Sequence, residues 1–351
     1  MLDRLIWIET ENTYPYRNLA MEEYMTTHVP EGACILFLWQ NRHTVVIGKN
    51  QNCWKECRVN HLEEEGGYLV RRLSGGGAVF HDLGNLNFTF MVRKADYDVE
   101  KQLEVILEAV KLVGIQAMKT GRNDITADGR KFSGNAFYQS GDACYHHGTL
   151  MLCADKENMS RYLNVSKEKL ASKGVSSVKS RVGNLCEFNP ELTVGRMKEA
   201  LVQAFSQVYG LKAERMDEGE LPEEDIRCLT EKFESWQWKY GRKIPFEYEI
   251  QRHFPWGGIQ IQLQVNEGKI QDINVFSDAM DQEMIGELAE RLTGCRYDVK
   301  AMCGAVAALG QKDVMRPEDG MHRKDGMCLE DDMRQKDNMR RDITALIKES
   351  L

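Results

Sequence analysis

Three consecutive glycines, Gly75–Gly77, stand between two strand-like segments and restrict the local fold more than any other feature of the sequence. The flanking segments, residues 68–73 and 85–92, have the apolar or alternating pattern of strands. Glycine lets the backbone approach a ligand closely, and successive N–H groups in such a bend can bind an anion. We therefore predict a phosphate or carboxylate site at this bend. The polar residues beside it are Arg71, Arg72 and Ser74.

The bend matches neither of the two common glycine-rich nucleotide-binding motifs. A P-loop ends in Gly-Lys-Ser/Thr and leads into a helix, whereas Ala78, Val79 and Phe80 follow the glycines here. A dinucleotide-binding loop also opens a helix, whereas residues 85–92 alternate with the period of a strand. The bend is therefore predicted to join two strands, and a tight structural turn explains the three glycines equally well.

Composition and charge narrow the class of protein. The chain has 351 residues, enough for one large and one small domain, and its 42% hydrophobic and 28% charged residues are typical of a globular protein. The net charge of −8 argues against nucleic acid as a partner. Asp3 and Arg4 interrupt the N-terminal segment, so we expect no signal peptide, and no apolar run reaches the roughly 20 residues of a membrane span. We expect a cytoplasmic monomer without nucleic-acid or membrane partners.

Cysteine usage favours a reducing compartment. The ten cysteines are scattered, and Cys53 and Cys57 are the closest pair. Because the sequence has no Cys-x-x-Cys pair and no secretion signal, we expect reduced thiols rather than a disulfide framework. It also lacks the paired ligand couplets of a structural zinc site, so zinc is not expected.

The order of the expected elements favours an α+β catalytic domain. Asn18 is the expected N-cap of the first helix, and Asp128-Gly129 is the expected turn of a hairpin over residues 125–132. No βαβ rhythm runs through the order, so we expect a largely antiparallel or mixed sheet. Strands are expected at residues 5–9, 34–39, 44–48 and 149–153, and helices at 18–28, 98–113 and 194–209.

A second domain is expected after a hinge at residues 241–245. Apolar residues alternate with glutamine over 258–265, and a turn at 266–268 leads into 270–276, which indicates a hairpin. Helical patterns follow at 282–292 and 297–309, and the acidic residues 214–224 are expected to form a connection. We therefore divide the chain into a catalytic domain, residues 1–244, and a small accessory α+β domain, residues 245–351.

Residues 315–338 form a repeat. Methionine recurs every six residues from Met315 to Met339, with an aspartate in phase, in the units MRPEDG, MHRKDG, MCLEDD and MRQKDN. Six is neither the helix nor the strand period, and one methionine per unit buries little. We predict a solvated, mobile, low-complexity tract that the chemistry does not need.

Small, polar and cationic clusters follow the glycine bend. Lys131 lies on an expected strand, where its ammonium group can meet a phosphate or a reacting carboxylate; a solvated strand lysine is the competing interpretation. Asp124 is a candidate magnesium ligand, since hard carboxylate oxygens suit that ion, or else the start of an Asx turn. His81, His146 and His147 are expected to orient loops rather than to bind metal.

Taken together, these blocks resemble the lipoate–protein ligases. The resemblance covers nearly the whole chain in order and spacing, apart from the methionine repeat, which looks like an insertion before the final helix. The matching blocks are NLAMEEYM (18–25), FLWQNRHTVVIGKNQNCWKEC (37–57), RRLSGGGAVFHDLGNLNFTF (71–90), GRND (121–124), KFSGNA (131–136), HHGTL (146–150), SKGVSSVKSRVGNL (172–185), and WGGIQIQLQVNEGKI and VFSDAM in the C-terminal part.

The resemblance implies a catalytic domain related to class II aminoacyl-tRNA synthetases and biotin ligases, with an accessory domain that moves during the cycle. It also implies two half-reactions. ATP, accompanied by Mg²⁺, and lipoate first give lipoyl-adenylate and pyrophosphate. The lipoyl group then passes to a lysine of an apo lipoyl domain, in the acyltransferases of 2-oxoacid dehydrogenases or in the glycine-cleavage H protein. No tightly bound cofactor is implied.

The resemblance also assigns roles by position. Lys131 is the implied catalytic residue and contacts both lipoate and the α-phosphate, and the loop at residues 179–183 borders the adenylate. Cations and N–H donors are needed there because carboxylate attack on phosphorus brings two anions together. The implied ATP-binding residues are Arg72, Gly77, Ala78, Val79, Phe80, Asn123, Asp124 and Lys131. The implied lipoate-binding residues are Leu19, Glu22, Trp39, Arg72, Ser74, Gly76, Lys131 and His147.

Three other functions compete with this one. An octanoyl- or lipoyltransferase of the same fold would use a cysteine acyl-enzyme without ATP. Cys144 and Cys186 lie nearest the matched blocks, but Cys144 falls in an expected turn and Cys186 follows the last block of the catalytic domain, 172–185. A non-catalytic acyl- or nucleic-acid-binding relative is disfavoured by the acidic charge and by the intact Arg72, glycine bend and Lys131. Biotin ligation is disfavoured because the Gly-Arg-rich adenylate loop is absent.

Overall fold

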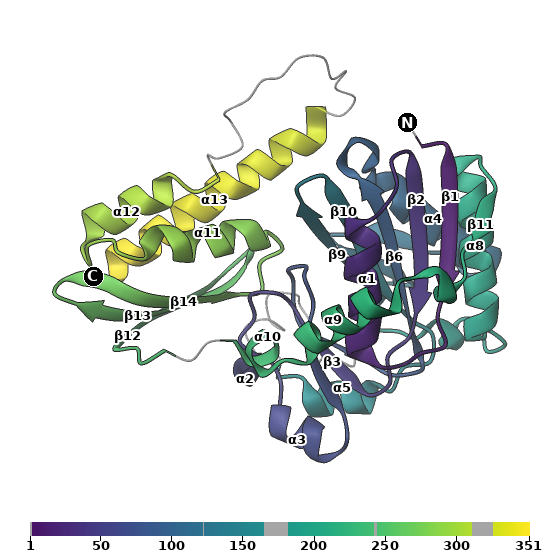
Figure 1. Ribbon diagram of the computed structural model, residues 1–351, viewed down its shortest axis with the longest axis horizontal. Coiled ribbons are helices and arrows are strands. Elements are labelled where there is room, and N and C mark those ends of the chain that lie inside the picture. Colours follow the sequence, from purple (N-terminus) through teal and green to yellow (C-terminus); the bar gives the residue numbers. More distant parts are fainter. Residues whose placement is uncertain (1, 122, 165–181, 242–243, 311–325) are drawn as a thin grey trace. The chain divides into compact units, whose positions relative to one another are not determined.

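The computed structural model describes residues 2–121, 123–164, 182–241, 244–310 and 326–351 (Figure 1). The chain divides into two compact units. The first comprises Met1–Gly48, Cys53–Ser74 and Ala78–Tyr240, and the second comprises Lys49–Asn52, Gly75–Gly77 and Gly241–Leu351. Two short N-terminal segments, one of them the triglycine bend, therefore group with the C-terminal part.

The first unit is built on an eight-stranded mixed sheet in the order β11-β1-β2-β6-β10-β9-β8-β7. β1 runs parallel to both of its neighbours, and the other pairs are antiparallel. This mixed sheet confirms the predicted fold class. Its strands are β1 (Arg4–Glu9), β2 (Ala33–Trp39), β6 (Asn85–Arg93), β7 (Met118–Thr120), β8 (Asp124–Ala127), β9 (Arg130–Ser140), β10 (Ala143–Met151) and β11 (Ala213–Arg215).

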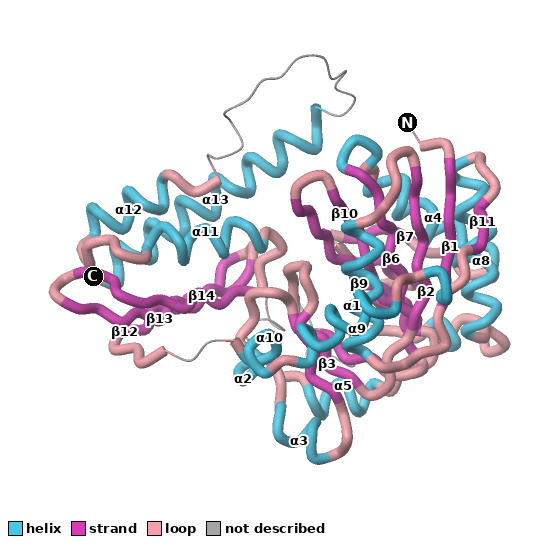
Figure 2. Tube along the Cα trace, viewed as in Figure 1, coloured by secondary structure: helices cyan, strands magenta, loops and turns pink. Residues whose placement is uncertain are grey.

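Helices cover both faces of the large sheet, as Figures 1 and 2 show. α1 (Pro15–Thr27) and α9 (Glu223–Glu234) pack on one face, and α4 (Val99–Leu112) and α8 (Val194–Tyr209) on the other. Side chains of β2 alternate between the two cores. Because both faces are buried, the strand reads as a continuous apolar run in the sequence. The candidate site lies on the α1 face.

A smaller sheet, β4-β3-β5, carries the glycine segment. It consists of β3 (Thr44–Ile47), β4 (Tyr68–Arg71) and β5 (Val79–His81). The helices α2 (Cys53–Glu56), α3 (Val59–Glu64) and α5 (Lys156–Tyr162) contribute side chains to the same hydrophobic core as this sheet. The glycines follow β4 and precede β5, and both strands pair with β3. The bend therefore joins two strands as predicted, although its second strand is β5 rather than the segment at 85–92. The remaining elements of this unit are the 3₁₀ helices η1 (Lys94–Asp96), η2 (Leu185–Glu187) and η3 (Glu218–Glu220), and α10 (Trp236–Tyr240).

The second unit has its own sheet and core. Its antiparallel strands are β12 (Tyr248–Phe254), β13 (Gly257–Asn266) and β14 (Lys269–Ser277), and its helices are α11 (Gln282–Leu292), α12 (Val299–Ala307) and α13 (Gly326–Ser350). The predicted hairpin and the first two helices are confirmed, whereas β12 was not predicted. Within this unit the Gly76 N–H donates to the Ala279 carbonyl at 3.1 Å.

Part of the methionine repeat is helical. α13 begins at Gly326, so residues 326–338 are helical, a structure that the repeat did not predict, while residues 315–325 lie outside the described part. The end of α13 is anchored by one apolar face in the core of the second unit, and methionine, arginine, lysine and glutamate upstream are good helix formers. The buried residues of that face are Met339, Ile343, Leu346 and Ile347.

The start of α1 also differs from the prediction. The helix begins at Pro15, whose fixed φ suits the first helical position, and Asn18 lies inside the helix. Asn18 is fully buried and donates to the carbonyls of Asn12 and Gln40, which fastens α1 to the end of β2. Over the described residues, no helix combines the length and apolar character needed to cross a membrane.

Candidate functional site

A chain of buried hydrogen bonds crosses the α1 face of the large sheet. Glu22 on α1 is 1% exposed, and its Oε1 accepts a hydrogen bond from Thr89 Oγ1 on β6 at 2.7 Å. The same oxygen lies 2.8 Å from His147 Nδ1 on β10. Thr89 in turn accepts from Trp39 Nε1 on β2 at 3.1 Å. Because an indole only donates, the hydroxyl proton of Thr89 is left for Glu22. Elements far apart in the sequence thus converge on one carboxylate.

The chain continues through His147 to the end of β4. His147 Nε2 lies 2.8 Å from Ser74 Oγ, and Arg72 Nε donates to the same hydroxyl oxygen at 3.0 Å. Burial lowers the pKa of Arg72 to about 10. This pKa is still above neutral pH, so the guanidinium keeps its charge. A buried cation, Arg72, and a buried carboxyl group, Glu22, therefore lie at opposite ends of a series of contacts that runs Arg72–Ser74–His147–Glu22.

Arg71 serves a structural purpose. Its Nε donates to the Trp238 carbonyl at 2.8 Å and its Nη2 to the Lys239 carbonyl at 2.7 Å, while the Trp238 indole donates back to the Arg71 carbonyl at 2.8 Å. These bonds fasten α10 to β4. The printed contacts of its Nε, Nη1 and Nη2 atoms are with the carbonyls of Trp238, Gly48 and Lys239, so a role of Arg71 in an anion site stays a prediction.

A second set of polar residues lies on the β8–β9 hairpin. Lys131 Nζ is 2.5 Å from Asp124 Oδ1, and the two side chains are 22% and 18% exposed. A Cβ added to Gly134 would lie 2.8 Å from Lys131 Nζ, so the ammonium group crosses directly over this glycine. The competing interpretation, a solvated strand lysine, does not describe this side chain.

A β-bulge explains how Lys131 reaches across Gly134. Ile125 pairs with Ser133 but Thr126 pairs with Lys131, so β9 has one extra residue, at Phe132. Residues three apart on a regular strand face opposite sides of the sheet, and the extra residue brings Lys131 and Gly134 to the same side. The bulge therefore directs the lysine toward Asp124.

The backbone on either side of this pair is also held. Asn123 Nδ2 donates to the Asn135 carbonyl at 3.0 Å, and Asn135 Nδ2 donates to the Asn123 carbonyl at 3.0 Å. The Gly183 N–H donates to the Lys131 carbonyl at 2.9 Å, and Val182 forms a parallel bridge with Lys131. Part of the predicted adenylate loop, Val182 and Gly183, is therefore beside Lys131, while residues 179–181 lie outside the described part.

The two sets are carried by neighbouring strands. His147 of β10 pairs with Ala136 of β9, and Gly148 pairs with Asn135. The structure thus brings Glu22, Trp39, Arg72, Ser74 and His147 together in one set, and Asn123, Asp124 and Lys131 in another.

The remaining predicted residues have packing positions or lie in the other unit. Leu19 is buried in the core under α1, and Phe80 is buried in the core of the small sheet, where it stacks on Tyr162. Ala78 and Val79 are half-buried. Gly76 and Gly77 group with the second unit, and the N–H of Gly76 is already used by the Ala279 carbonyl.

The acidic residues indicate which role a metal can have. Among the residues that the structure describes, no three His, Cys, Asp or Glu side chains gather as metal ligands. Magnesium bound with a nucleotide needs only one or two protein carboxylates, because phosphate and water oxygens complete its coordination. Asp124 fits that role and does not fit a resident metal centre.

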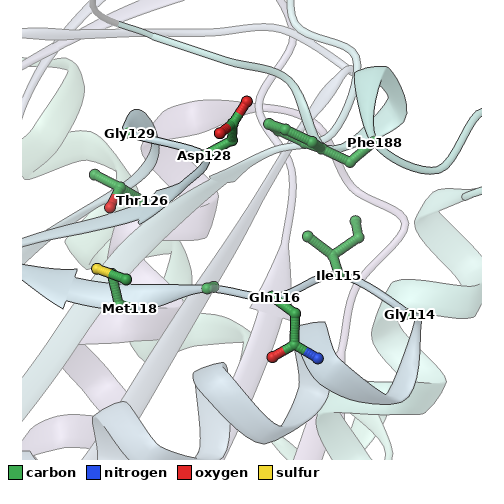
Figure 3. Close-up of a pocket in the computed structure, with 9 residues that line it drawn as sticks. Gly114, Ile115, Gln116, Met118, Thr126, Asp128, Gly129 and Phe188 are labelled. Atoms are coloured by element: carbon green, nitrogen blue, oxygen red, sulfur yellow. The ribbon is translucent and has the colours of Figure 1, made fainter.

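A surface pocket elsewhere on the first unit has different chemistry (Figure 3). Its volume is about 710 Å³, and Asp128 is the one ionisable side chain among the described residues that line it. None of these lining residues is a cation that could pair with an anionic substrate. Its lining residues are Gly114, Ile115, Gln116, Ala117, Met118, Thr126, Asp128, Gly129 and Phe188.

Comparison with known families decides the relationship. A family model described as lipoyl protein ligase A/B catalytic domain matches residues 14–206, more than half of the chain, and one described as bacterial lipoate protein ligase C-terminus matches residues 243–318. The chain belongs to the lipoate–protein ligase family.

Solved structures of lipoate ligases share this fold. LipL1 of P. falciparum, in complex with lipoate, is 26% identical with a TM-score of 0.78, and the match covers 97% of this chain and 99% of that one. A bi-partite lipoate protein ligase of Thermoplasma acidophilum, described with its E2 lipoyl domain, is 27% identical with a TM-score of 0.61, over 70% of this chain and 99% of that one. A lipoate-protein ligase A bound with ATP is 25% identical with a TM-score of 0.60, over 69% and 99%.

Two cysteines of this ligase-family chain do not behave as predicted. Cys153 and Cys186, whose Cα atoms are 5.8 Å apart, pair as a disulfide rather than as two reduced thiols. The Cys186 N–H bonds to the Leu152 carbonyl, which brings η2 beside the chain that leaves β10. Cys144 lies inside β10 rather than in a turn, fully buried in the core on the α4 and α8 side.

Thr89 and Asn135 belong to the two polar sets but were not predicted as site residues. The strand alternation of residues 85–92 is a signal for Thr89, because it is a polar residue between the buried Phe88 and Phe90. Asn135 lies in the matched block KFSGNA. No sequence signal, however, shows which partner either side chain meets.

Proposed function

We propose that this chain activates lipoate with ATP as lipoyl-adenylate and then transfers the lipoyl group to a lysine of an apo lipoyl domain. In the first step a lipoate carboxylate oxygen attacks the α-phosphorus and pyrophosphate leaves. In the second step the lysine amine attacks the acyl carbon, AMP leaves and the amine loses a proton. The observation that carries this proposal is the presence of two cation-bearing polar sets in a ligase-family fold, that of Arg72 and that of Lys131. They come to neighbouring strands through His147 on β10 and Lys131 on β9.

Lys131 is the residue we assign to the reacting groups. Its ammonium is partly buried and held by Asp124, so its position is fixed before substrates arrive. Two unit charges about 4 Å apart at an effective dielectric constant of about 20 attract each other by about 4 kcal/mol. An ammonium between a carboxylate and an α-phosphate therefore offsets the repulsion between the two anions and the charge that develops on phosphorus.

The Arg72 set is assigned to the lipoate end of the site. Arg72 supplies a buried positive charge, and Ser74 and His147 supply polar atoms beside it. Trp39 and Leu19 provide an apolar surface of the kind that an acyl chain requires. A mostly apolar lining with a few placed polar groups is the usual composition of a small-molecule site.

Magnesium enters this proposal with the nucleotide. Asp124 would hold it by one carboxylate, and the ion would supply further neutralisation of phosphate charge. The chain's own contribution is to hold Asp124 against Lys131 and to hold Asn123 by reciprocal hydrogen bonds with Asn135.

The acceptors we propose are lipoyl domains of 2-oxoacid dehydrogenase acyltransferases and the glycine-cleavage H protein. The related Thermoplasma acidophilum ligase, described with its E2 lipoyl domain, supports this class of acceptor. The cysteine acyl-enzyme route is disfavoured, because Cys144 faces the core opposite Glu22 and Cys186 is paired with Cys153.

Product analysis tests the proposal. Incubation with lipoate, ATP, Mg²⁺ and an apo lipoyl domain should give one lipoylated lysine together with AMP and pyrophosphate in equal amounts. Formation of ADP and phosphate, or lipoylation from an acyl donor without ATP, would contradict it. An apo lipoyl domain whose acceptor lysine is replaced by arginine is the matched control, and it should remain unmodified.

A further inference from the structure

His146 and Asn135 form a buried polar contact to which the proposed chemistry gives no role. His146 lies on β10 and is 0% exposed, and Asn135 lies on β9 and is 3% exposed. His146 Nε2 is 2.8 Å from Asn135 Oδ1, and Nδ1 is 3.2 Å from Gln102 Oε1 on α4. Successive residues of a strand face opposite sides, so His146 faces α4 whereas His147 faces Glu22. Burial of polar groups is costly unless they are hydrogen-bonded, and here each side chain has a partner.

The direction of these hydrogen bonds follows from their surroundings. Asn135 Nδ2 donates to the Asn123 carbonyl at 3.0 Å, so Asn135 Oδ1 faces His146 as an acceptor. Burial lowers the pKa of His146 to about 3, and the ring is therefore neutral near pH 7. A neutral imidazole has one N–H, and here Nε2 must carry it. Nδ1 then accepts, which requires the Gln102 amide to present its nitrogen, an orientation of equal shape.

Asn135 also contacts Asn123, the residue that immediately precedes β8. Its backbone N–H and its Nδ2 both donate to the Asn123 carbonyl, at 2.9 and 3.0 Å, and Asn123 Nδ2 donates back to the Asn135 carbonyl at 3.0 Å. The next residue is Asp124, whose carboxylate pairs with Lys131 at 2.5 Å. A continuous series of contacts therefore runs from His146 to the ammonium group.

The absence of a side chain at Gly148 leaves the space that the Asn135 amide occupies. A Cβ at position 148 would lie 2.8 Å from Asn135 Oδ1 and 2.5 Å from the Phe88 ring. Gly148 thus lets the Asn135 amide lie against β10, where His146 can reach it.

We propose that His146 and Asn135 are positioning residues for the nucleotide half of the site. The contact with His146 fixes the rotation of the Asn135 side-chain amide. Asn135 in turn holds the backbone of Asn123, and through this backbone it positions the next residue, Asp124, whose carboxylate pairs with Lys131. The inference rests on the proposed function in assigning the segment from Asn123 to Lys131 to ATP. Arg72, Ser74, His147 and Glu22, the set assigned to the lipoate end, are not part of this series. The effect is therefore expected on ATP and on the reacting groups beside Lys131.

Kinetics of adenylate formation test this inference in three variants and a control. In Asn135→Ala and His146→Leu, kcat/KM for ATP should fall about 10- to 100-fold, by analogy with the loss when a hydrogen-bond partner of a metal ligand is removed. The dissociation constant for lipoate, measured by calorimetry without ATP, should change less than kcat/KM for ATP, because the Arg72 set is not part of the series. His146→Gln keeps an N–H donor and should recover most of the loss, which a role in packing alone would not explain.

Ser133→Ala is the matched control. Ser133 is buried on the same strand, and its Oγ has no hydrogen-bond partner within the described residues. Its removal therefore changes a buried polar side chain of β9 without touching Asn123. This variant should retain the kcat/KM of the wild-type protein for ATP.

Amide hydrogen exchange in the ligand-free protein gives a readout without catalysis. Exchange over residues 123–126 should become faster in Asn135→Ala and His146→Leu, because the segment loses its restraint, and should be unchanged in Ser133→Ala. Equal exchange and equal kcat/KM in Asn135→Ala and the control would overturn the inference. If the segment responds as expected but the wild-type protein makes no lipoyl-adenylate, the proposed function fails while the restraint by Asn135 and His146 stands.

Discussion

Lys131 and Asp124 form an ion pair of 2.5 Å across the β8–β9 hairpin, and the bulge at Phe132 is what brings them to the same side. The lysine lies over Gly134, which leaves room for the ammonium group but for no side chain. The position of the proposed catalytic cation is therefore set by one strand irregularity, one carboxylate and one missing Cβ.

Gly134→Ala should reduce adenylate formation while leaving the fold intact. The new methyl group would lie 2.8 Å from Lys131 Nζ, and the flexible lysine can move away without a shift of the backbone. A displacement of about 1 Å in a reacting constellation can cost about 10²-fold in rate. Single-turnover formation of lipoyl-adenylate and thermal unfolding are the two measurements. A normal rate together with a normal unfolding temperature would show that the ammonium position is not critical.

Glu22→Gln should destabilise the protein by about 1.5–3 kcal/mol, the usual contribution of hydrogen bonds to a charged group. Thr89 and His147 both contact Oε1, and a neutral amide oxygen in its place is a weaker acceptor than a carboxylate oxygen. Urea unfolding measures the change. Glu23→Gln is the matched control on the same helix. Glu23 pairs with Lys232, whose side chain is 35% exposed, and pairs open to solvent contribute about 0–1 kcal/mol. Equal unfolding free energies for the two variants would contradict the importance of the buried chain.

Cys144→Ala and Cys186→Ala should both retain lipoylation activity with ATP. Neither thiol presents a nucleophile to the Arg72 and Lys131 sets, since one is in the core and the other is paired. Intact mass spectrometry of the enzyme with lipoate and ATP should reveal no thioester-linked lipoyl group. An acylated cysteine, with loss of transfer in the corresponding variant, would instead support the acyl-enzyme route.

Two buried histidines should make the protein less stable in acid. Burial lowers the pKa of His81 and of His146 to about 3, whereas an unfolded histidine titrates near pH 6.5. The unfolded chain therefore binds more protons below that pH, so the unfolding free energy should be full above about pH 6.5 and fall as the pH drops toward about 3. Each histidine contributes a slope of up to about 1.4 kcal/mol per pH unit. Urea unfolding of His146→Gln should have a shallower pH dependence than the wild type; equal slopes would mean that His146 is not held neutral.

Strong periodic patterns predicted helices and strands well. The helix at 194–209 was predicted with its observed ends, because its apolar face is regular and Gly210 ends it in a left-handed conformation with φ of 69°. The short strands β5 and β12 were not predicted. In α13 the six-residue methionine period obscured a helix, since the residues that anchor it lie after the repeat.

The sequence predicted several residues of the candidate site but not the hydrogen bonds that join them. Family blocks pointed to Glu22, Ser74 and His147, yet only the pairing of β2, β6 and β10 shows that Thr89 joins Trp39 to Glu22. Arg71 and Arg72 are adjacent in the sequence, yet Arg71 donates to the Trp238 carbonyl and Arg72 donates to the Ser74 hydroxyl. The Cys153–Cys186 pair depends in the same way on a contact between distant segments that composition does not reveal.

Lipoate-dependent exchange of labelled pyrophosphate into ATP tests the central claim most directly. Exchange requires reversible adenylate formation, so the wild-type protein should catalyse it with lipoate present and no lipoyl domain. Lys131→Ala should lose about 10²-fold or more, the scale for removing one oriented stabiliser of developing charge. Lys119→Ala, which removes a lysine paired with Glu100 at the surface, should not. Absence of exchange in the wild type, or near-normal exchange in Lys131→Ala, would contradict this account.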